Sequence, residues 1–167
     1  MPIPTPDSRE ADLAALYERL GPRLFRYAAA ILASAQDAEE VVQEVFMAIA
    51  EMNPWPKDTD PYLFRAVRNA SLKLLSRTQR RRKLLSEGAF QLVPREGADP
   101  GVGELAGAAA KALGDLPAEQ RETVALHLFE GQTFEAIGEL CGVPAATAAS
   151  RYRYGIEKMR EVLDERR

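Results

Sequence analysis

Apolar residues recur at helical spacing along most of the chain, and this pattern predicts an all-α fold. In residues 8–32 the stripe consists of Leu13, Leu16, Tyr17, Leu20, Leu24, Ala28, Ile31 and Leu32. Gly21 and Pro22 interrupt the stripe, because an interior proline removes a hydrogen bond and crowds the preceding turn. We therefore expect a long first helix with a kink or a local break near its middle.

The next apolar stripe predicts a second helix over residues 35–50. Its inner face carries Val42, Val45, Phe46 and Ile49. Asp37 is a candidate N-cap, with Glu40 three residues later as in a capping box. Polar side chains occupy another face: Glu39, Glu40, Gln43 and Glu44. Simple solvation explains such an acidic face, and docking of a basic partner is the alternative.

A loop and a basic helix follow. Residues 53–60 hold two prolines around the only tryptophan, Trp55, and Asp60 before Pro61 predicts the start of a third helix. From Arg65 to Lys83 this helix carries eight basic residues and no acid. A solvated basic face is the simplest interpretation. Because like charges repel, an anionic partner would relieve the strain, and nucleic acid fits since neutralised phosphates release counterions.

Composition changes over residues 84–103, where glycine and proline replace the apolar stripe. We interpret this segment as a flexible linker between two small helical domains, residues 8–83 and 104–165. The second domain should contain four helices. In the second of them, Val124, Leu128 and Phe129 are expected to point inward.

The last two predicted helices have the form of a helix-turn-helix. Thr133 is a good N-cap for the first, and Gly142 can adopt the left-handed conformation that ends a helix. The second begins near Ala145, and its inward stripe is Ala148, Tyr152, Ile156, Met159 and Leu163. Such a helix can enter a DNA major groove, whereas an ordinary αα-hairpin is the alternative.

Overall composition limits the function classes. The 167 residues carry a net charge of -3, so no global basic field holds nucleic acid and the local distribution of charge matters instead. Cys141 and His127 are the only cysteine and histidine, which excludes an internal disulfide, suits a reducing cytoplasm and leaves no metal-ligand set. We expect no cofactor, no catalytic constellation, no signal peptide and no membrane insertion.

The order of these segments resembles the small, two-domain sigma factors of the bacterial extracytoplasmic-function (ECF) type. Residues 16–28 look like the opening helix of that family's promoter-melting domain, and residues 37–49 look like the helix that docks on the polymerase. Residues 64–75 resemble the helix that meets the minus-ten element. Residues 116–144 and 147–163 resemble the domain that reads the minus-thirty-five element.

The resemblance implies a cytoplasmic, non-enzymatic promoter-specificity subunit. Its partners would be core RNA polymerase (beta-prime clamp helices and beta flap), promoter DNA as duplex and melted strand, and a candidate anti-sigma factor. The implied polymerase contacts are Glu39, Glu40, Gln43 and Glu44. The implied DNA contacts are Arg65, Arg68, Asn69, Lys73, Arg77, Thr147, Ser150, Arg151 and Arg153. Asn53 and Trp55 occupy the loop that helps trap a flipped base in the family.

The predicted reading helix departs from the family pattern. Valine and lysine often follow its threonine in the family, whereas Ala148 and Ala149 follow Thr147 here. Few polar side chains then reach base edges, so specificity at the upstream element rests on few contacts or on DNA shape.

Two other function classes remain open at this point. A free-standing helix-turn-helix regulator would bind duplex DNA alone, but it needs neither the acidic nor the basic helix of the first domain. A helical interaction protein without a DNA role would leave the charge of the basic helix unexplained. A salt-dependent shift of promoter DNA with core polymerase separates these hypotheses.

Overall fold

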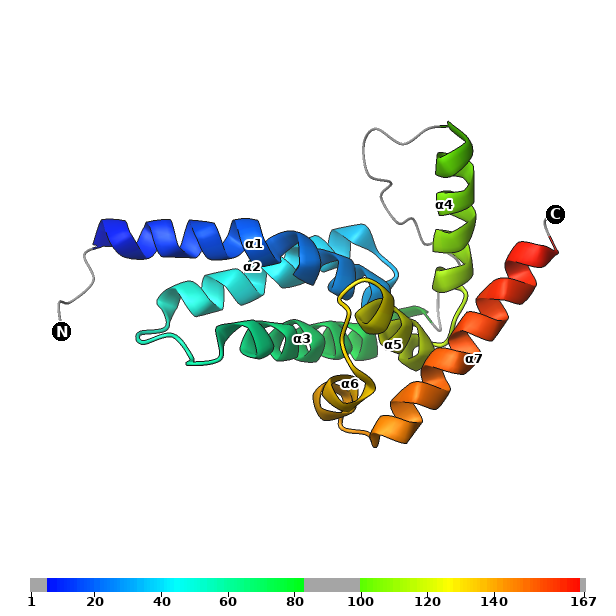
Figure 1. Cartoon of the computed structure of the whole chain (residues 1–167). Coiled ribbons are helices and arrows are strands. Elements are labelled where there is room, and N and C mark those ends of the chain that lie inside the picture. The colour runs from blue at the N-terminus through cyan, green and yellow to red at the C-terminus, as the bar shows by residue number, and fades with distance from the viewer. Residues whose placement is uncertain (1–5, 83–99, 166–167) are drawn as a thin grey trace.

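The computed structural model describes residues 6–82 and 100–165, with side chains described for residues 8–78 and 107–165. This part of the chain forms seven helices and contains no strand, as the apolar pattern predicted (Figure 1). The helices are α1 (Pro6–Leu32), α2 (Ala35–Glu51), α3 (Thr59–Arg82), α4 (Pro100–Gly114), α5 (Ala118–Leu128), α6 (Phe134–Cys141) and α7 (Ala145–Asp164). No helix within the described residues is long and apolar enough to cross a membrane.

Helices α1, α2 and α3 pack on one another to form the first domain (Figure 1). The predicted stripe of α1 is largely buried, with Leu20 and Leu24 fully covered. Tyr17 is the exception: it is about half exposed and its ring packs edge-on against Phe46. Of the two predicted alternatives, a kink or a local break, the break is absent: α1 continues through Pro22. Burial of the flanking leucines in one core offsets the hydrogen bond that the proline removes.

The predicted cap of α2 was wrong. Ser34, not Asp37, is the N-cap, and its hydroxyl accepts a hydrogen bond of 3.2 Å from the amide of Asp37. Ala33 adopts a left-handed conformation with φ of 53° between α1 and α2. Because of this tight turn α2 starts at Ala35, and Asp37 lies inside the first turn. There its negative charge stabilises the helix by interacting with the positive end of the helix dipole.

The second domain consists of α4 to α7. Helix α4 begins at Pro100, earlier than the expected Glu104, and the rest of the predicted linker lies outside the described residues. The helix-turn-helix boundaries are confirmed: the Thr133 hydroxyl accepts from the amide of Ala136, and Gly142 adopts φ of 69°. Helix α7 then begins at Ala145, as predicted.

One prediction for α5 failed. Val124 is fully buried, but Leu128 and Phe129 are 51% and 48% exposed. Helix α5 ends at Leu128 and the chain turns back at Gly131, whose φ is 63°. The last two apolar side chains therefore project beyond the core of the second domain, toward α1.

The turn between α6 and α7 depends on Gly138. A Cβ atom at this position would lie 2.6 Å from the carbonyl oxygen of Val143, which is backbone and cannot yield without moving the turn. We expect Gly138→Ala to lower the free energy of unfolding by about 1–3 kcal/mol, as overpacking does. Urea denaturation followed by circular dichroism measures this change. Gly107→Ala is the matched control, because nothing lies within 4 Å of its Cβ position; equal stability of the two variants would contradict the prediction.

Candidate nucleic-acid interface

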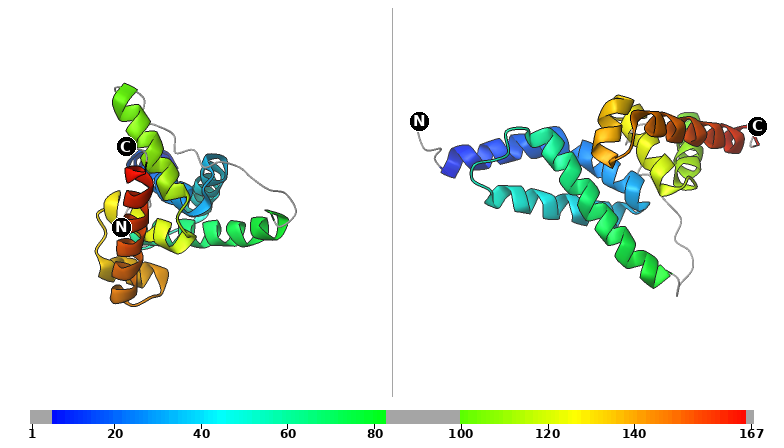
Figure 2. Two further views of the ribbon diagram at one scale, coloured as in Figure 1. Left: turned by 90° about the vertical axis from the view of Figure 1, so that its right-hand side faces the viewer. Right: turned by 90° about the horizontal axis from the view of Figure 1, so that it is seen from below.

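The two domains share one apolar core, and their relative orientation was not predictable from the sequence. Leu126, Ile137 and Ala148 of the second domain are fully buried in the same cluster as the core of the first domain. Helix α5 lies against α1 in this arrangement (Figures 1 and 2). We call it the closed form. It determines which of the predicted site residues are accessible.

A buried carboxylate of α5 pairs with the first domain. One oxygen of Glu122 accepts from the Tyr27 hydroxyl at 2.8 Å and from Nε of Arg68 at 2.7 Å. The Glu122 side chain is only 5% exposed. Burial raises the pKa of Tyr27 far above its ordinary value, and the adjacent Glu122 charge raises this pKa further. Burial opposes the charge on Arg68, but its hydrogen bond to Glu122 keeps the Arg68 pKa above the ordinary value.

A second carboxylate makes a similar contact from the turn after α5. Glu130, 2% exposed, accepts from Nε of Arg23 at 2.6 Å and lies 3.5 Å from Nη2 of Arg26. Arg121 supplies a third connection, in which the donor belongs to the second domain and the acceptors belong to the first. Its guanidinium donates to the carbonyls of Ala30 and Ile31 at the end of α1. These charged contacts across the domains join α1 and α3 to the α5 region.

The sequence alone did not identify Arg121, Glu122 or Glu130 as functional residues. Six consecutive residues of α5, from Arg121 to Leu126, are buried. The sequence of α5 mixes charged and apolar residues without a clear apolar stripe, so it gives no signal that Arg121 and Glu122 are buried or which partners they have.

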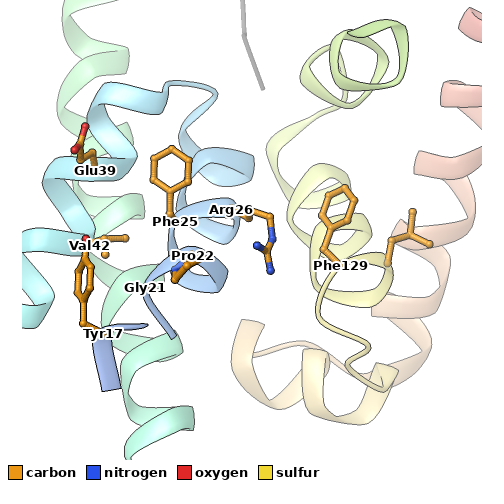
Figure 3. Close-up of a pocket in the computed structure, with 9 residues that line it drawn as sticks. Tyr17, Gly21, Pro22, Phe25, Arg26, Glu39, Val42 and Phe129 are labelled. Carbon is orange, nitrogen blue, oxygen red and sulfur yellow. The ribbon is translucent and has the colours of Figure 1, made fainter. Parts of the chain in front are cut away.

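The predicted polymerase contacts remain exposed on α2 but face different depressions. Glu39 lines a groove of about 830 Å³ between α1 and α5, where Phe129 lies across from Arg26 (Figure 3). Gln43 borders an apolar depression between α1 and α2 that includes Met47, which is 70% exposed. Glu40 and Glu44 line a third groove, between α2 and α3.

The structure divides the predicted minus-ten residues of α3 into two groups. Arg68 points to the second domain, and its side chain is only 17% exposed. Arg65 borders the same junction but is exposed. The other members line the groove of Glu40 and Glu44, and all are exposed: Asn69, Lys73 and Arg77. This groove has a volume of about 350 Å³.

The loop ahead of α3 presents its two predicted residues differently. Asn53 is exposed, whereas Trp55 is half-buried and packs against the core of the first domain. The indole N–H of Trp55 is buried and has no hydrogen-bond partner among the described residues. Trp55 thus has a packing role, and its buried indole donor is left unsatisfied within the described residues.

The predicted DNA contacts of α7 lie in its first half. Thr147 is half-buried, and the Ser150 hydroxyl donates to the carbonyl of Ala146 at 2.9 Å. Arg151 lies 3.3 Å from the carboxylate of Glu119, within the same domain. Arg153 is exposed and lies over the ring of Tyr154.

Cys141 and His127 have packing roles in the structure. His127 stacks on Phe134 with 4.5 Å between ring centroids, and its Nδ1 is 2.8 Å from the carbonyl of Gln132. Burial raises the pKa of the Cys141 thiol to about 11. Within the described residues no group of histidine, cysteine, aspartate or glutamate side chains is arranged to hold a metal ion.

Comparisons with known proteins assign both domains to one family. Residues 16–81 match the model of Sigma-70 region 2, and residues 112–161 match that of Sigma-70, region 4. CarQ of Myxococcus xanthus, an RNA polymerase sigma factor, is 30% identical over 155 residues, which cover 90% of this chain and 88% of CarQ. The ECF RNA polymerase sigma factor SigE of Mycolicibacterium smegmatis is 30% identical over 147 residues, which cover 84% of this chain and 57% of SigE.

Solved structures share the fold. The sigma factor RpoE of Bartonella quintana, in complex with the anti-sigma factor NepR, matches with a TM-score of 0.70 and 22% identity over 93% of this chain and 99% of RpoE. CnrH in complex with the cytosolic domain of CnrY matches with a TM-score of 0.62 and 21% identity, covering 93% of this chain and 90% of CnrH. The chain therefore belongs to the sigma-70 family, as an ECF-type sigma factor that binds core RNA polymerase and directs it to promoters for the initiation of transcription.

Proposed function

We propose that the exposed acidic face of α2 is the polymerase-docking surface and that the adjoining face of α3 contacts the melted minus-ten strand. The proposed domains are residues 8–83 and 104–165. Helix α7 reads the minus-thirty-five element through Thr147, Ser150, Arg151 and Arg153. The chemistry of RNA synthesis belongs to the polymerase, and the cytoplasm, where the polymerase works, is where this function takes place.

The groove between α2 and α3 is the single observation that carries this proposal. Glu40 and Glu44 line it from α2, and Asn69, Lys73 and Arg77 line it from α3. Carboxylates suit a basic protein surface, whereas lysine and arginine suit phosphates. A chain that joins these two surfaces along one groove can hold a DNA strand directly beside the polymerase.

The loop before α3 has a proposed role in trapping a flipped base. Asn53 is exposed and can donate or accept hydrogen bonds. Trp55 supplies a supporting wall rather than a free stacking surface, because it packs on the core. Base contact at this loop therefore depends more on Asn53 than on Trp55.

An anti-sigma factor is a proposed regulatory partner. The similar structure of RpoE is a complex with the anti-sigma factor NepR, and that of CnrH is a complex with the cytosolic domain of CnrY. The exposed apolar side chains Leu128 and Phe129 border the groove between the domains, opposite α1. Such a surface suits an apolar partner segment that touches both domains at once.

Reversing the charge of Glu40 and Glu44 should weaken binding to core polymerase about tenfold or more, equivalent to about 1.4 kcal/mol. Both side chains are exposed, so Glu40→Lys with Glu44→Lys removes the attraction without disturbing the core. Titration of labelled protein with core polymerase measures the change.

The control variant carries Glu51→Lys and Asp58→Lys, which reverse two exposed acids of the first domain outside the proposed surface. It should bind core polymerase almost as tightly as the unchanged protein. Unaltered affinity of the Glu40 and Glu44 variant would remove this face from the docking surface. Sequence-selective binding of promoter DNA by the chain alone, at nanomolar concentration, would instead support a free-standing regulator.

A further inference from the structure

Four side chains of the first domain form a cluster of donors against the second domain, and we call this cluster the interdomain cradle. Its members are Arg23, Arg26, Tyr27 and Arg68. The first three come from α1 and the last from α3. All four face carboxylates of the second domain, which are almost completely buried. The cradle is therefore a positively charged face that the second domain covers in the closed form, largely at Tyr27 and Arg68 and partly at Arg23 and Arg26.

Each carboxylate occupies a position that a phosphate group could also fill. Glu122 accepts from both Tyr27 and Arg68, at 2.8 and 2.7 Å. Glu130 accepts from Nε of Arg23 at 2.6 Å, with Arg26 at 3.5 Å. The planar guanidinium group matches carboxylates and phosphates with the same donor geometry. A protein anion and a nucleic-acid anion would thus compete for the same donors.

Aromatic rings lie beside the cradle. The Arg23 guanidinium lies 5.5 Å from the centroid of Phe64, and the rings of Tyr27 and Phe64 are 5.5 Å apart. Surfaces that bind single-stranded nucleic acid combine cations along the backbone with aromatic side chains. An arginine held over a ring also keeps its orientation when its carboxylate partner leaves.

We propose that the cradle binds the phosphates of single-stranded promoter DNA when the domains separate, and that Glu122 and Glu130 block it in the closed form by taking the places of two phosphates. This inference rests on the proposed DNA-binding role of the first domain, and it extends the DNA-contacting surface from α3 onto α1. The second domain then acts as an internal competitor. By thermodynamic reciprocity, closure weakens DNA binding as much as DNA binding opposes closure.

The energetics of the closed form suit such a competitor. Removing a carboxylate and an arginine from water costs free energy that is comparable to their attraction, so buried ion pairs contribute little net stability. The interface between the domains therefore relies on these pairs for its specific fit more than for its strength. When the domains separate, the three arginines lose their carboxylate partners. The phosphates of a DNA strand can then pair with these arginines instead.

The test measures binding of a fluorescently labelled single-stranded oligonucleotide of 20 thymidines to the full chain, without polymerase. Glu122→Gln with Glu130→Gln keeps the size of both side chains but removes their charge. We expect this variant to bind about tenfold more tightly than the unchanged protein, within the usual range of coupling between sites. Two additional phosphate contacts should also steepen the slope of log affinity against log salt by about 1.4.

Two further variants test the cradle itself. Adding Arg23→Ala and Arg68→Ala to the glutamine background should abolish most of the gain. Asp115→Asn with Glu135→Gln is the matched control, because it neutralises two exposed carboxylates of the second domain and changes the net charge equally. That control should leave both the affinity and the salt slope close to those of the unchanged protein.

Each outcome decides the proposal. No gain in the glutamine variant, a gain that survives loss of the arginines, or an equal gain in the control would overturn it. Should the double glutamine variant fold poorly, Glu130→Gln alone should still give a smaller gain and a smaller increase in slope. Since no polymerase is present, failure here is distinct from failure of the docking proposal, which the titration with core polymerase tests.

Discussion

Replacing Arg68 and Lys73 by alanine should reduce open-complex formation by the holoenzyme about tenfold or more and flatten its salt dependence. Each lost phosphate contact to a single strand removes about 0.7 from the slope of log affinity against log salt, so the pair should remove about 1.4. Lys73 is exposed in the groove beside α2, whereas Arg68 is paired with Glu122 in the closed form. The measurement is permanganate reactivity of the melted region over a range of salt concentrations.

The two side chains can be separated by single variants. Lys73→Ala has no described ion-pair partner to leave behind, so it should lower the salt slope by about 0.7 through lost DNA contact alone. Arg68→Ala also leaves the Glu122 carboxylate buried beside Tyr27 and Cys141 without its cation, and this should loosen the closed form. Lys111→Ala removes an exposed cation of α4 as a control. A salt slope unchanged in the double variant would mean that neither side chain contacts phosphate.

Arg121→Ala should lower the free energy of unfolding by about 3 kcal/mol or more, the largest effect expected of a single substitution on stability. The buried guanidinium donates to four backbone carbonyls in two chain segments. Two belong to Ala30 and Ile31 at the end of α1, and two belong to Gly114 and Leu116 before α5. Hydrogen bonds from a charged donor contribute about 1.5–3 kcal/mol each, and water recovers part of the loss. For a chain of this length the midpoint of thermal unfolding should fall by about 6 °C or more.

Calorimetry with two companion variants checks the role of Arg121. Arg160→Ala removes an exposed arginine of α7 and should change the midpoint very little. Arg121→Lys keeps the charge but lacks the planar fork, so it should recover only part of the stability. Full recovery by lysine would mean that charge rather than the pattern of hydrogen bonds stabilises this junction.

The local signals in the sequence predicted the helices well. Thr133 and Gly142 marked the ends of α6 because each acts through its own backbone neighbourhood. The cap of α2 was missed because two nearby residues could fill that role, and the choice depended on how α1 ended at Ala33. Periodicity also misplaced Leu128 and Phe129, because a stripe does not reveal where a helix stops.

The candidate site was predictable as a set of exposed charges but not as a geometry. Glu40 and Glu44 were placed correctly on the outer face of α2, yet the shared groove with Lys73 depends on how α2 packs against α3. The contact between Tyr27 and Glu122 joins residues 95 positions apart, and a single sequence holds no signal for such a pair. Closure of the domains was therefore visible only in the structure.

The distance along the chain between the two halves of the junction has a consequence for synthesis. Arg121 is 91 residues beyond Ala30, whose carbonyl it binds. Ribosomes add about 5–20 residues per second, so α1 is made roughly 5–18 s before Arg121 exists. During that interval the end of α1 and the arginines of the cradle have none of the second-domain partners they have in the closed form. The nascent chain thus presents its basic face before the carboxylates that later cover it have been made.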